Sequence, residues 1–153
     1  MSTVRTRRLQ SGDREVARRL FTMMAEVFDE PRAQLGDGYL DALLHREDFW
    51  AIAAMAEGEV VGGLTAHALP MTRSESVELF IYDVAVRADW QRRGVGRQLV
   101  TTLREGAAQS GIPVAFVPAA TEDAHALDFY RAIGGEPTPV VLFTFTTKVP
   151  DVP

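Results

Sequence analysis

The chain is predicted to fold as an α/β domain with a mixed, mostly antiparallel central sheet flanked by helices. Three observations predict this class. Apolar runs of strand length alternate with amphipathic segments, the Glu-Gly-Glu stretch at 57–59 separates two apolar runs as in a hairpin, and residues 77–117 form a strand–helix–strand unit that requires a parallel crossover. With 153 residues, we expect a single domain over 1–153 that can bury its own core.

The first two predicted elements are a strand and a helix. Alternating apolar and polar residues at 4–9 predict a short strand. A helix is predicted from about 14 to 28, because its apolar residues recur at helical spacing. Ser11 or Asp13 could provide the N-cap, and Pro31 ends the helix.

The remaining elements alternate between helices and strands. A second, shorter helix is predicted within residues 36–48, and its expected buried side consists of Tyr39, Leu40, Leu43 and Leu44. The hairpin occupies residues 49–69, and the longest strand candidate covers 77–86. The last four elements are a helix that reaches Ser110 and is closed by Gly111, a strand at 114–119, a helix at 122–133 closed by Gly134, and an alternating strand at 140–147.

Composition excludes several classes of function. The net charge of −5 argues against a general nucleic-acid binder, which would cover phosphates with basic side chains. The absence of cysteine excludes disulfides, thiolate metal sites and a cysteine nucleophile. Because the N-terminus lacks the apolar stretch of a signal peptide and no segment approaches a membrane span, we expect a soluble, cytoplasmic protein without a membrane partner.

The stretch WQRRGVGR, residues 90–97, joins the longest strand to a helix. Gly94 and Gly96 allow the backbone to approach a ligand closely, and the first helical turn offers unpaired N–H donors. Three arginines add positive charge, so the expected ligand is a pyrophosphate. The stretch has neither the Gly-Lys-Ser/Thr of a Walker loop nor the three glycines of a dinucleotide-binding fingerprint.

Two motifs resemble those of the GNAT superfamily of N-acetyltransferases. The segment from Val84 to Gly96 is similar to its acetyl-coenzyme A signature, which ends in Q/R-x-x-G-x-G/A. Ala126, Phe129, Tyr130 and Gly134 are similar to its second signature, A-x-x-F-Y-x-x-x-G. The chain departs from the superfamily pattern at Asp123, where asparagine is frequent, and at Gly135, where phenylalanine is frequent. The departure at Asp123 puts in doubt a side-chain amide bond to the pantetheine arm.

The resemblance implies a particular fold and cosubstrate. It implies splayed strands at an acetyl-coenzyme A site, without a metal, and a homodimer is among the assemblies common in the superfamily. The implied coenzyme contacts are Val84, Ala85, Val86, Gln91, Arg92, Arg93, Gly94, Val95, Gly96, Arg97, Asp123, Ala126 and Phe129. The three histidines show no metal-ligand spacing.

A narrower resemblance concerns the acceptor. The segment IYDVAV, residues 81–86, and the stretches 39–70 and 122–130 are similar to the class-one aminoglycoside 3-N-acetyltransferases, the gentamicin-resistance branch of the superfamily. This resemblance implies transfer of acetyl to the 3-amino group of an aminoglycoside, by direct attack in a ternary complex. The position of attack is implied by the resemblance alone.

Acetyl transfer to an amine needs a base for the ammonium proton and benefits from an acid for the leaving thiolate. Glu78 and Asp83 are the acids on the longest strand. Strict alternation would place them on opposite faces, whereas the bulge found in superfamily structures would change the facing of everything beyond it. We favour Asp83, because it directly precedes Val84, and Glu78 stays a candidate. Tyr130 matches the superfamily tyrosine near the thioester sulfur, although a buried core tyrosine is the other interpretation.

Acidic residues are also the candidates for binding a polycationic acceptor. They could instead belong to solvated helix faces. The candidates are Asp29, Glu30, Asp37, Glu78, Asp83, Glu122 and Asp123. The same charges would attract polyamines, so a polyamine or protein N-acetyltransferase is one alternative, and a non-catalytic acetyl-coenzyme A-binding module is another.

Overall fold

The computed structural model describes residues 3–31 and 34–151, in two compact units, Met1–Pro118 and Ala119–Pro153. We describe each unit by itself. The elements of the first unit are β1 (Arg5–Arg8), α1 (Arg14–Val27), α2 (Asp37–His45), β2 (Phe49–Ala56), β3 (Glu59–Pro70), β4 (Val77–Val86), the 3-10 turn η1 (Ala88–Trp90), α3 (Val95–Gln109) and β5 (Val114–Phe116). The second unit contains α4 (Ala124–Ala132).

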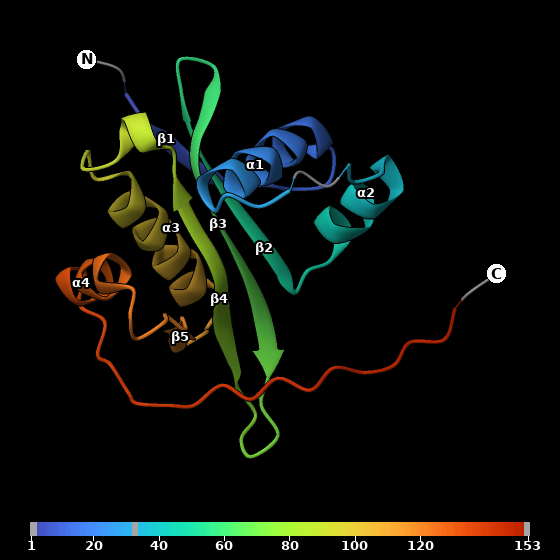
Figure 1. Cartoon of the computed structure of the whole chain (residues 1–153), viewed down its shortest axis with the longest axis vertical. Coiled ribbons are helices and arrows are strands. Elements are labelled where there is room, and N and C mark those ends of the chain that lie inside the picture. Colours follow the sequence, from blue (N-terminus) through green and yellow to red (C-terminus); the bar gives the residue numbers. More distant parts are fainter. Residues whose placement is uncertain (1–2, 32–33, 152–153) are drawn as a thin grey trace. The chain divides into compact units, whose positions relative to one another are not determined.

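The first unit is built on an open sheet of five strands in the order β1-β2-β3-β4-β5 (Figure 1). Every neighbouring pair is antiparallel except β4 and β5, which are parallel and joined by α3. The predicted mixed, mostly antiparallel sheet and its single parallel unit are therefore confirmed. No helix in the described ranges is both long and apolar enough to cross a membrane.

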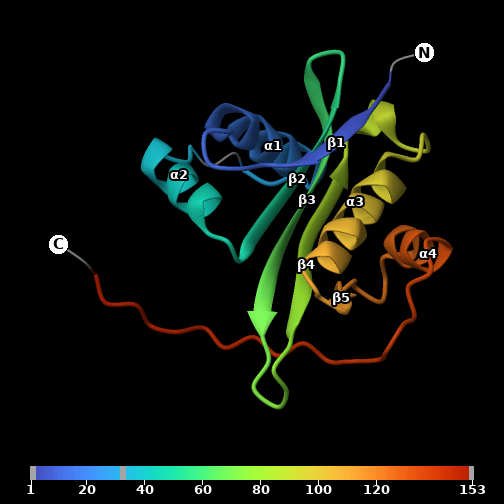
Figure 2. The same ribbon diagram turned by 180° about the vertical axis from the view of Figure 1, so that it is seen from behind.

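Helices cover both faces of this sheet (Figures 1 and 2). Adjacent residues of a strand point to opposite faces, and two glycines of β3 mark which helix lies on each. A Cβ atom at Gly63 would lie 1.9 Å from Cδ1 of Leu20 in α1, and one at Gly62 would lie 2.9 Å from Cγ1 of Val95 in α3. The absence of side chains at these two positions therefore lets α1 and α3 approach the strand backbone closely.

The core on the α1 face also contains α2. Leu20 and Leu40 are completely buried, and they belong to one cluster with Leu44 and Phe49. The predicted buried side of α2 is wrong for Tyr39, whose exposed fraction is 58%. Leu40 and Leu44 fill one stripe of this short helix, and Tyr39 lies outside that stripe.

Two predicted helix boundaries are close to those observed. Asp13 precedes α1 at the N-cap position, but its carboxylate accepts bonds from Arg7 and from the Gln10 N–H instead of capping the helix. Helix α3 ends one residue earlier than predicted, and Gly111 follows with a positive φ of 73°.

The second unit confirms one predicted helix and lacks one predicted strand. Helix α4 is capped by Asp123, whose carboxylate accepts a bond from the Ala126 N–H at 3.0 Å. The predicted strand at 140–147 is wrong, since no strand is assigned between residues 136 and 151. Alternation indicates that one face of a strand can be buried, but a strand also needs a partner ladder, and the side chains of Leu142 and Phe145 are 83% and 89% exposed.

Candidate active site

A bulge in β4 organises the candidate site. Thr65 of β3 pairs with Asp83, whereas the next residue, Ala66, pairs with Ile81. Tyr82 is therefore an extra residue in β4 that has no partner in β3. A bulge of this kind reverses the facing of all residues beyond it relative to strict alternation.

The bulge brings the two candidate carboxylates to the same face of the sheet. Directly paired residues of neighbouring strands share a face, as do residues two apart in one strand. Asp83 pairs with Thr65, and His67, two residues further along β3, pairs with Phe80. Thr65 and His67 share a face of β3, so their partners Asp83 and Phe80 share that face as well. Glu78 lies two residues before Phe80 and therefore faces the same side as Asp83.

This shared face is the one covered by α1. Ala85 lies two residues after Asp83, and it is buried in the same core cluster as Leu20 of α1. Glu30, in the segment that follows α1, acts electrostatically on Asp83, so this segment lies near the same side of β4. The candidate base and the acidic candidate Glu30 are thus close to one face of the sheet.

Asp83 has an environment suited to accepting a proton. Its side chain is half-buried, and in the described part of the chain its carboxylate has no hydrogen bond or ion pair. Burial raises the pKa of Asp83 above its ordinary value of 3.8, and the negative charge of Glu30 raises this pKa further. A carboxylate with a raised pKa is a stronger base, which general-base catalysis at neutral pH requires.

The structure contains the predicted splay beside β4. Parallel pairing with β5 covers only Glu78–Phe80 against Val114–Phe116, while β4 continues to Val86. Among the described residues, β4 thus has no strand partner on this side from residue 81 onward. Backbone groups on such an edge are available to the amides of a bound ligand. The Val86 carbonyl accepts a bond from the Gln91 side chain at 3.1 Å.

The turn after β4 has the geometry expected of an anion-binding helix start. Gly94 occupies the N-cap of α3 in the left-handed region, with φ 79° and ψ 9°, and it offers no side-chain cap. The N–H groups of the first turn have no acceptor within the helix, so they are available to a phosphate. Arg93 lies over the Trp90 ring, with Cζ 4.7 Å from the ring centroid, and Arg92 is exposed.

The acidic candidates fall into three groups. Asp29 and Glu30 follow α1 and are exposed. Asp37 differs, because its carboxylate forms ion pairs with Arg14 at 3.2 Å and with Arg18. Its charge is therefore balanced within the α1–α2 contact. The last group, Glu122 and Asp123, belongs to the second unit.

The second unit holds the other candidates of the second signature. Asp123 already accepts the Ala126 N–H, so the carboxylate at this position serves the helix itself. Phe129 and Tyr130 pack edge to face, with ring centroids 5.1 Å apart. A Cβ at position 135 would lie 2.9 Å from the Tyr130 carbonyl oxygen. This close approach accounts for the glycine where the superfamily often has phenylalanine.

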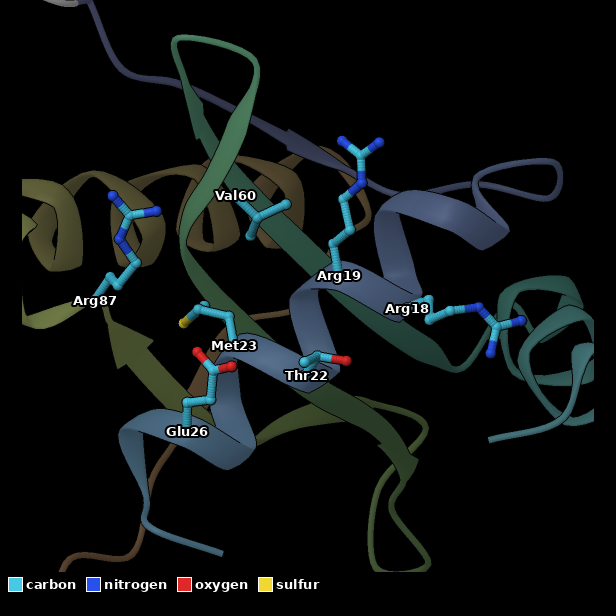
Figure 3. Close-up of a pocket in the computed structure, with 7 residues that line it drawn as sticks. All are labelled: Arg18, Arg19, Thr22, Met23, Glu26, Val60 and Arg87. Carbon is cyan, nitrogen blue, oxygen red and sulfur yellow. The ribbon is translucent and has the colours of Figure 1, made fainter. Parts of the chain in front are cut away.

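A shallow pocket of about 310 Å³ lies between α1 and the ends of β3 and β4 (Figure 3). Its lining is Arg18, Arg19, Thr22, Met23, Glu26, Val60 and Arg87. Its cations are largely neutralised, since Arg18 pairs with Asp37, and Arg87 pairs with Glu59 at 2.9 Å and Asp89 at 2.7 Å. None of the predicted site residues lines this pocket, so we place the candidate site at the bulge and the α3 turn.

Sequence reasoning missed Thr65 as a candidate site residue. It lies opposite Asp83 in β3 and is 6% exposed, and it is the buried polar residue of the described core. The available signal was a hydroxyl within the apolar run at 60–66.

In the described ranges, no group of three or more potential ligands could hold a metal ion.

Comparisons with known proteins identify the family. A profile described as "Acetyltransferase (GNAT) family" matches residues 15–134. The chain therefore belongs to the GNAT acetyltransferase family, whose members use acetyl-coenzyme A. The observed fold is the GNAT fold. No curated protein sequence matches the chain.

Solved structures with similar folds include aminoglycoside acetyltransferases. One is meta-AAC0020 from an uncultured soil metagenomic sample, in complex with trehalose, which is 33% identical with a TM-score of 0.90, covering 95% of this chain and 97% of that one. The same enzyme in complex with sisomicin is 32% identical with a TM-score of 0.91 and the same coverage. AAC(6′)-Iy in complex with coenzyme A is 19% identical with a TM-score of 0.77, covering 95% and 96%, and shares the fold.

Proposed function

We propose that the protein transfers the acetyl group of acetyl-coenzyme A to an amino group of an aminoglycoside, most specifically the 3-amino group. The observation that carries this proposal is the placement of Glu78 and Asp83 on one face of β4, next to an unpaired strand edge that leads into the α3 turn. Donor and acceptor sites would thus meet at the bulge.

The donor side would be held mainly by backbone groups. The N–H groups of the first α3 turn and the nearby arginines would bind the pyrophosphate. The edge of β4 at Val84–Val86 would bind the amides of the pantetheine arm through backbone groups other than the Val86 carbonyl, which accepts the Gln91 side chain. These are the positions to which the superfamily signature assigns the coenzyme, and acetyl-coenzyme A would supply the acetyl group as a thioester.

Asp83 would act as the base on the acceptor side. The ammonium loses one proton to Asp83, the neutral nitrogen forms a bond to the acetyl carbon, the carbon–sulfur bond breaks, and the nitrogen releases its second proton to solvent as the amide forms. Tyr130, the tyrosine that the second signature assigns to this step, would donate a proton to the leaving thiolate. The raised pKa of Asp83 favours the proton transfer because the carboxylate is a stronger base.

Glu78 would serve a different amino group from the one that reacts. Five residues of extended strand separate it from Asp83, which corresponds to a distance on the order of 15 Å along β4. One small ammonium cannot contact both carboxylates over such a distance. A polycation with several amino groups on a rigid frame can, and Glu30 and Asp29 would add further attraction.

The relatives support an aminoglycoside as acceptor. The 32% identical enzyme meta-AAC0020 was crystallised with sisomicin, a sugar-based polycation. Attack at the 3-amino group follows from the resemblance of residues 81–86 to the class-one 3-N-acetyltransferases. A cytoplasmic location and a homodimer stay predictions from the sequence.

The test is thiol release from acetyl-coenzyme A with gentamicin, sisomicin, spermidine and an N-terminal peptide as separate acceptors. We expect the two aminoglycosides to give the highest kcat/KM, and NMR of the product should locate the acetyl group on the 3-amino nitrogen. Background rates with both aminoglycosides would reject the proposal. Acetylation at another position would keep the acceptor class and reject the regiochemistry.

A polyamine acetyltransferase is the second candidate function. The exposed carboxylates after α1 would attract spermidine as well as an aminoglycoside. In the same assay, a kcat/KM for spermidine above that for either aminoglycoside would favour this alternative.

A further inference from the structure

A row of aromatic rings crosses the sheet on the face that carries the candidate carboxylates. Phe49 of β2 pairs with His67 of β3, His67 pairs with Phe80 of β4, and Phe80 pairs with Phe116 of β5. Two of these pairs are in ring contact, with centroids 5.4 Å apart for Phe49 and His67 and 5.2 Å apart for Phe80 and Phe116. We call these four residues, together with Tyr82, the aromatic row.

Tyr82 joins the row because of the bulge. Its ring lies 6.0 Å from that of His67 and 5.9 Å from that of Phe80, in both cases edge to face. With strict alternation along β4, Tyr82 would share the face of Phe80 and Asp83 would face the other side. The bulge leaves Tyr82 on the face of Phe80 and also turns Asp83 to that face. The ring and the candidate base are thus consecutive residues on one side of the strand.

The row is covered at one end and open at the other. At the β2 end, Phe49 is 7% exposed and contacts Phe21 of α1, with ring centroids 6.5 Å apart. At the other end, Tyr82 is 63% exposed and Phe116 is 39% exposed. Aromatic side chains carry a large apolar area, so these two rings present an exposed apolar surface beside the candidate carboxylates.

The surroundings of the open end indicate its occupant. Along β4, Glu78 precedes the open rings and Asp83 follows them, both on the same face. A purely apolar partner would leave these carboxylates without a counterion. A linear polycation would satisfy the carboxylates but would have no flat apolar face for the rings. An amino sugar has both, since its ring C–H groups form a flat apolar face and its ammonium groups project from the edge.

We propose that Tyr82 and Phe116 form a stacking platform for one sugar ring of the acceptor, while Glu78 and Asp83 bind ammonium groups on either side of it. This inference rests on the proposed function, because it names how that acceptor is recognised. It assigns Tyr82 to specificity, as a residue that contacts the acceptor without taking part in proton transfer.

The test compares Tyr82→Ala and Tyr82→Phe with wild type, with sisomicin as the ringed acceptor and spermidine as the linear one. Loss of an aromatic contact should raise the KM and the calorimetric Kd for sisomicin about tenfold. The kcat should change less than about threefold, since Asp83 is untouched. Tyr82→Phe keeps the ring and should behave like wild type. The spermidine Kd should not change in either variant.

Tyr39→Ala is the matched control, because Tyr39 is similarly exposed, at 58%, but lies on α2 outside the aromatic row. Equal effects of Tyr82→Phe and Tyr82→Ala would assign the contact to the hydroxyl and overturn the platform, as would equal losses for spermidine and sisomicin. If the protein acetylates aminoglycosides and the Tyr82→Ala variant binds sisomicin with an unchanged Kd, the platform is rejected and the proposed function is kept. Ring-dependent sisomicin binding without turnover would keep the platform and reject the function.

Discussion

Replacing Gly63 by alanine should destabilise the fold through a single identifiable contact. A Cβ at this position would lie 1.9 Å from Cδ1 of Leu20, which must retreat by about 1.5 Å to reach the 3.4 Å of an ordinary van der Waals contact. Leu20 is completely buried, so it has little room to move. Overpacking of this kind costs about 1–3 kcal/mol, and the reduced freedom of the unfolded chain offsets about 0.4–1 kcal/mol.

The expected net loss is therefore about 1–2 kcal/mol, which for a chain of this length lowers Tm by roughly 3–6 °C. Urea unfolding should give the free-energy change, and thermal melting the Tm. Gly38→Ala is the control, because nothing lies within 4 Å of its Cβ position and it is within α2. Alanine there should stabilise by up to about 1 kcal/mol.

A double-mutant cycle with Leu20→Ala identifies the contact. Leu20→Ala alone should cost about 2–5 kcal/mol by leaving a cavity. If Leu20 is the residue that clashes, the double variant should be more stable than the sum of the two changes predicts, by about 1 kcal/mol or more. Additive effects, or a loss below about 0.5 kcal/mol for Gly63→Ala, would refute the reasoning.

Four further predictions concern the site. Asp83→Asn should lower kcat by about 10²–10⁴-fold while the Kd for acetyl-coenzyme A, measured by titration, changes little; an unchanged kcat would remove Asp83 as the base. Because burial raises the pKa of Asp83 in the folded state, its protonated form favours folding, and this contribution is lost as the pH rises through the folded pKa. Asp83→Asn should therefore raise Tm at pH 7, and the gain should vanish near the unfolded value of 3.8, whereas a pH-independent gain would contradict the assigned burial. Glu30→Gln removes a charge that raises this pKa, so the acid limb of the kcat/KM profile should move to lower pH, and a limb that stays in place would show that Glu30 does not act on Asp83. Gly94→Val places a branched side chain in the left-handed region, so the Kd for acetyl-coenzyme A should rise at least about tenfold with kcat retained at saturation, and the reverse pattern would reject the cradle.

Elements with strong local signals were predicted well from the sequence. The strand at 77–86 is observed with those bounds, because a long apolar run between a polar loop and a glycine-bearing turn leaves few alternatives. The helix after Gly94 was equally clear from its amphipathic pattern. Both motifs depend on residues that are close together in the chain.

Features that depend on partners were predicted less well. The strand at 114–119 is reduced to Val114–Phe116, because only this part pairs with β4. The position of the bulge could not be derived from the residues, since Tyr82 sits in an ordinary β-type stretch and the extra residue exists only relative to β3. The relation between Glu78 and Asp83 was therefore left open by the sequence and is defined by the strand register.

The extra residue at position 82 can be removed without changing the relative facing of the two carboxylates. Deleting Tyr82 would restore strict alternation, and Asp83 would then lie four residues after Glu78, so both would stay on one face with their present partners in β3. The exposed ring between them would be lost. Loss of a single codon here would thus remove a ring from the acceptor side while both charges remain, a change that counting substitutions would overlook.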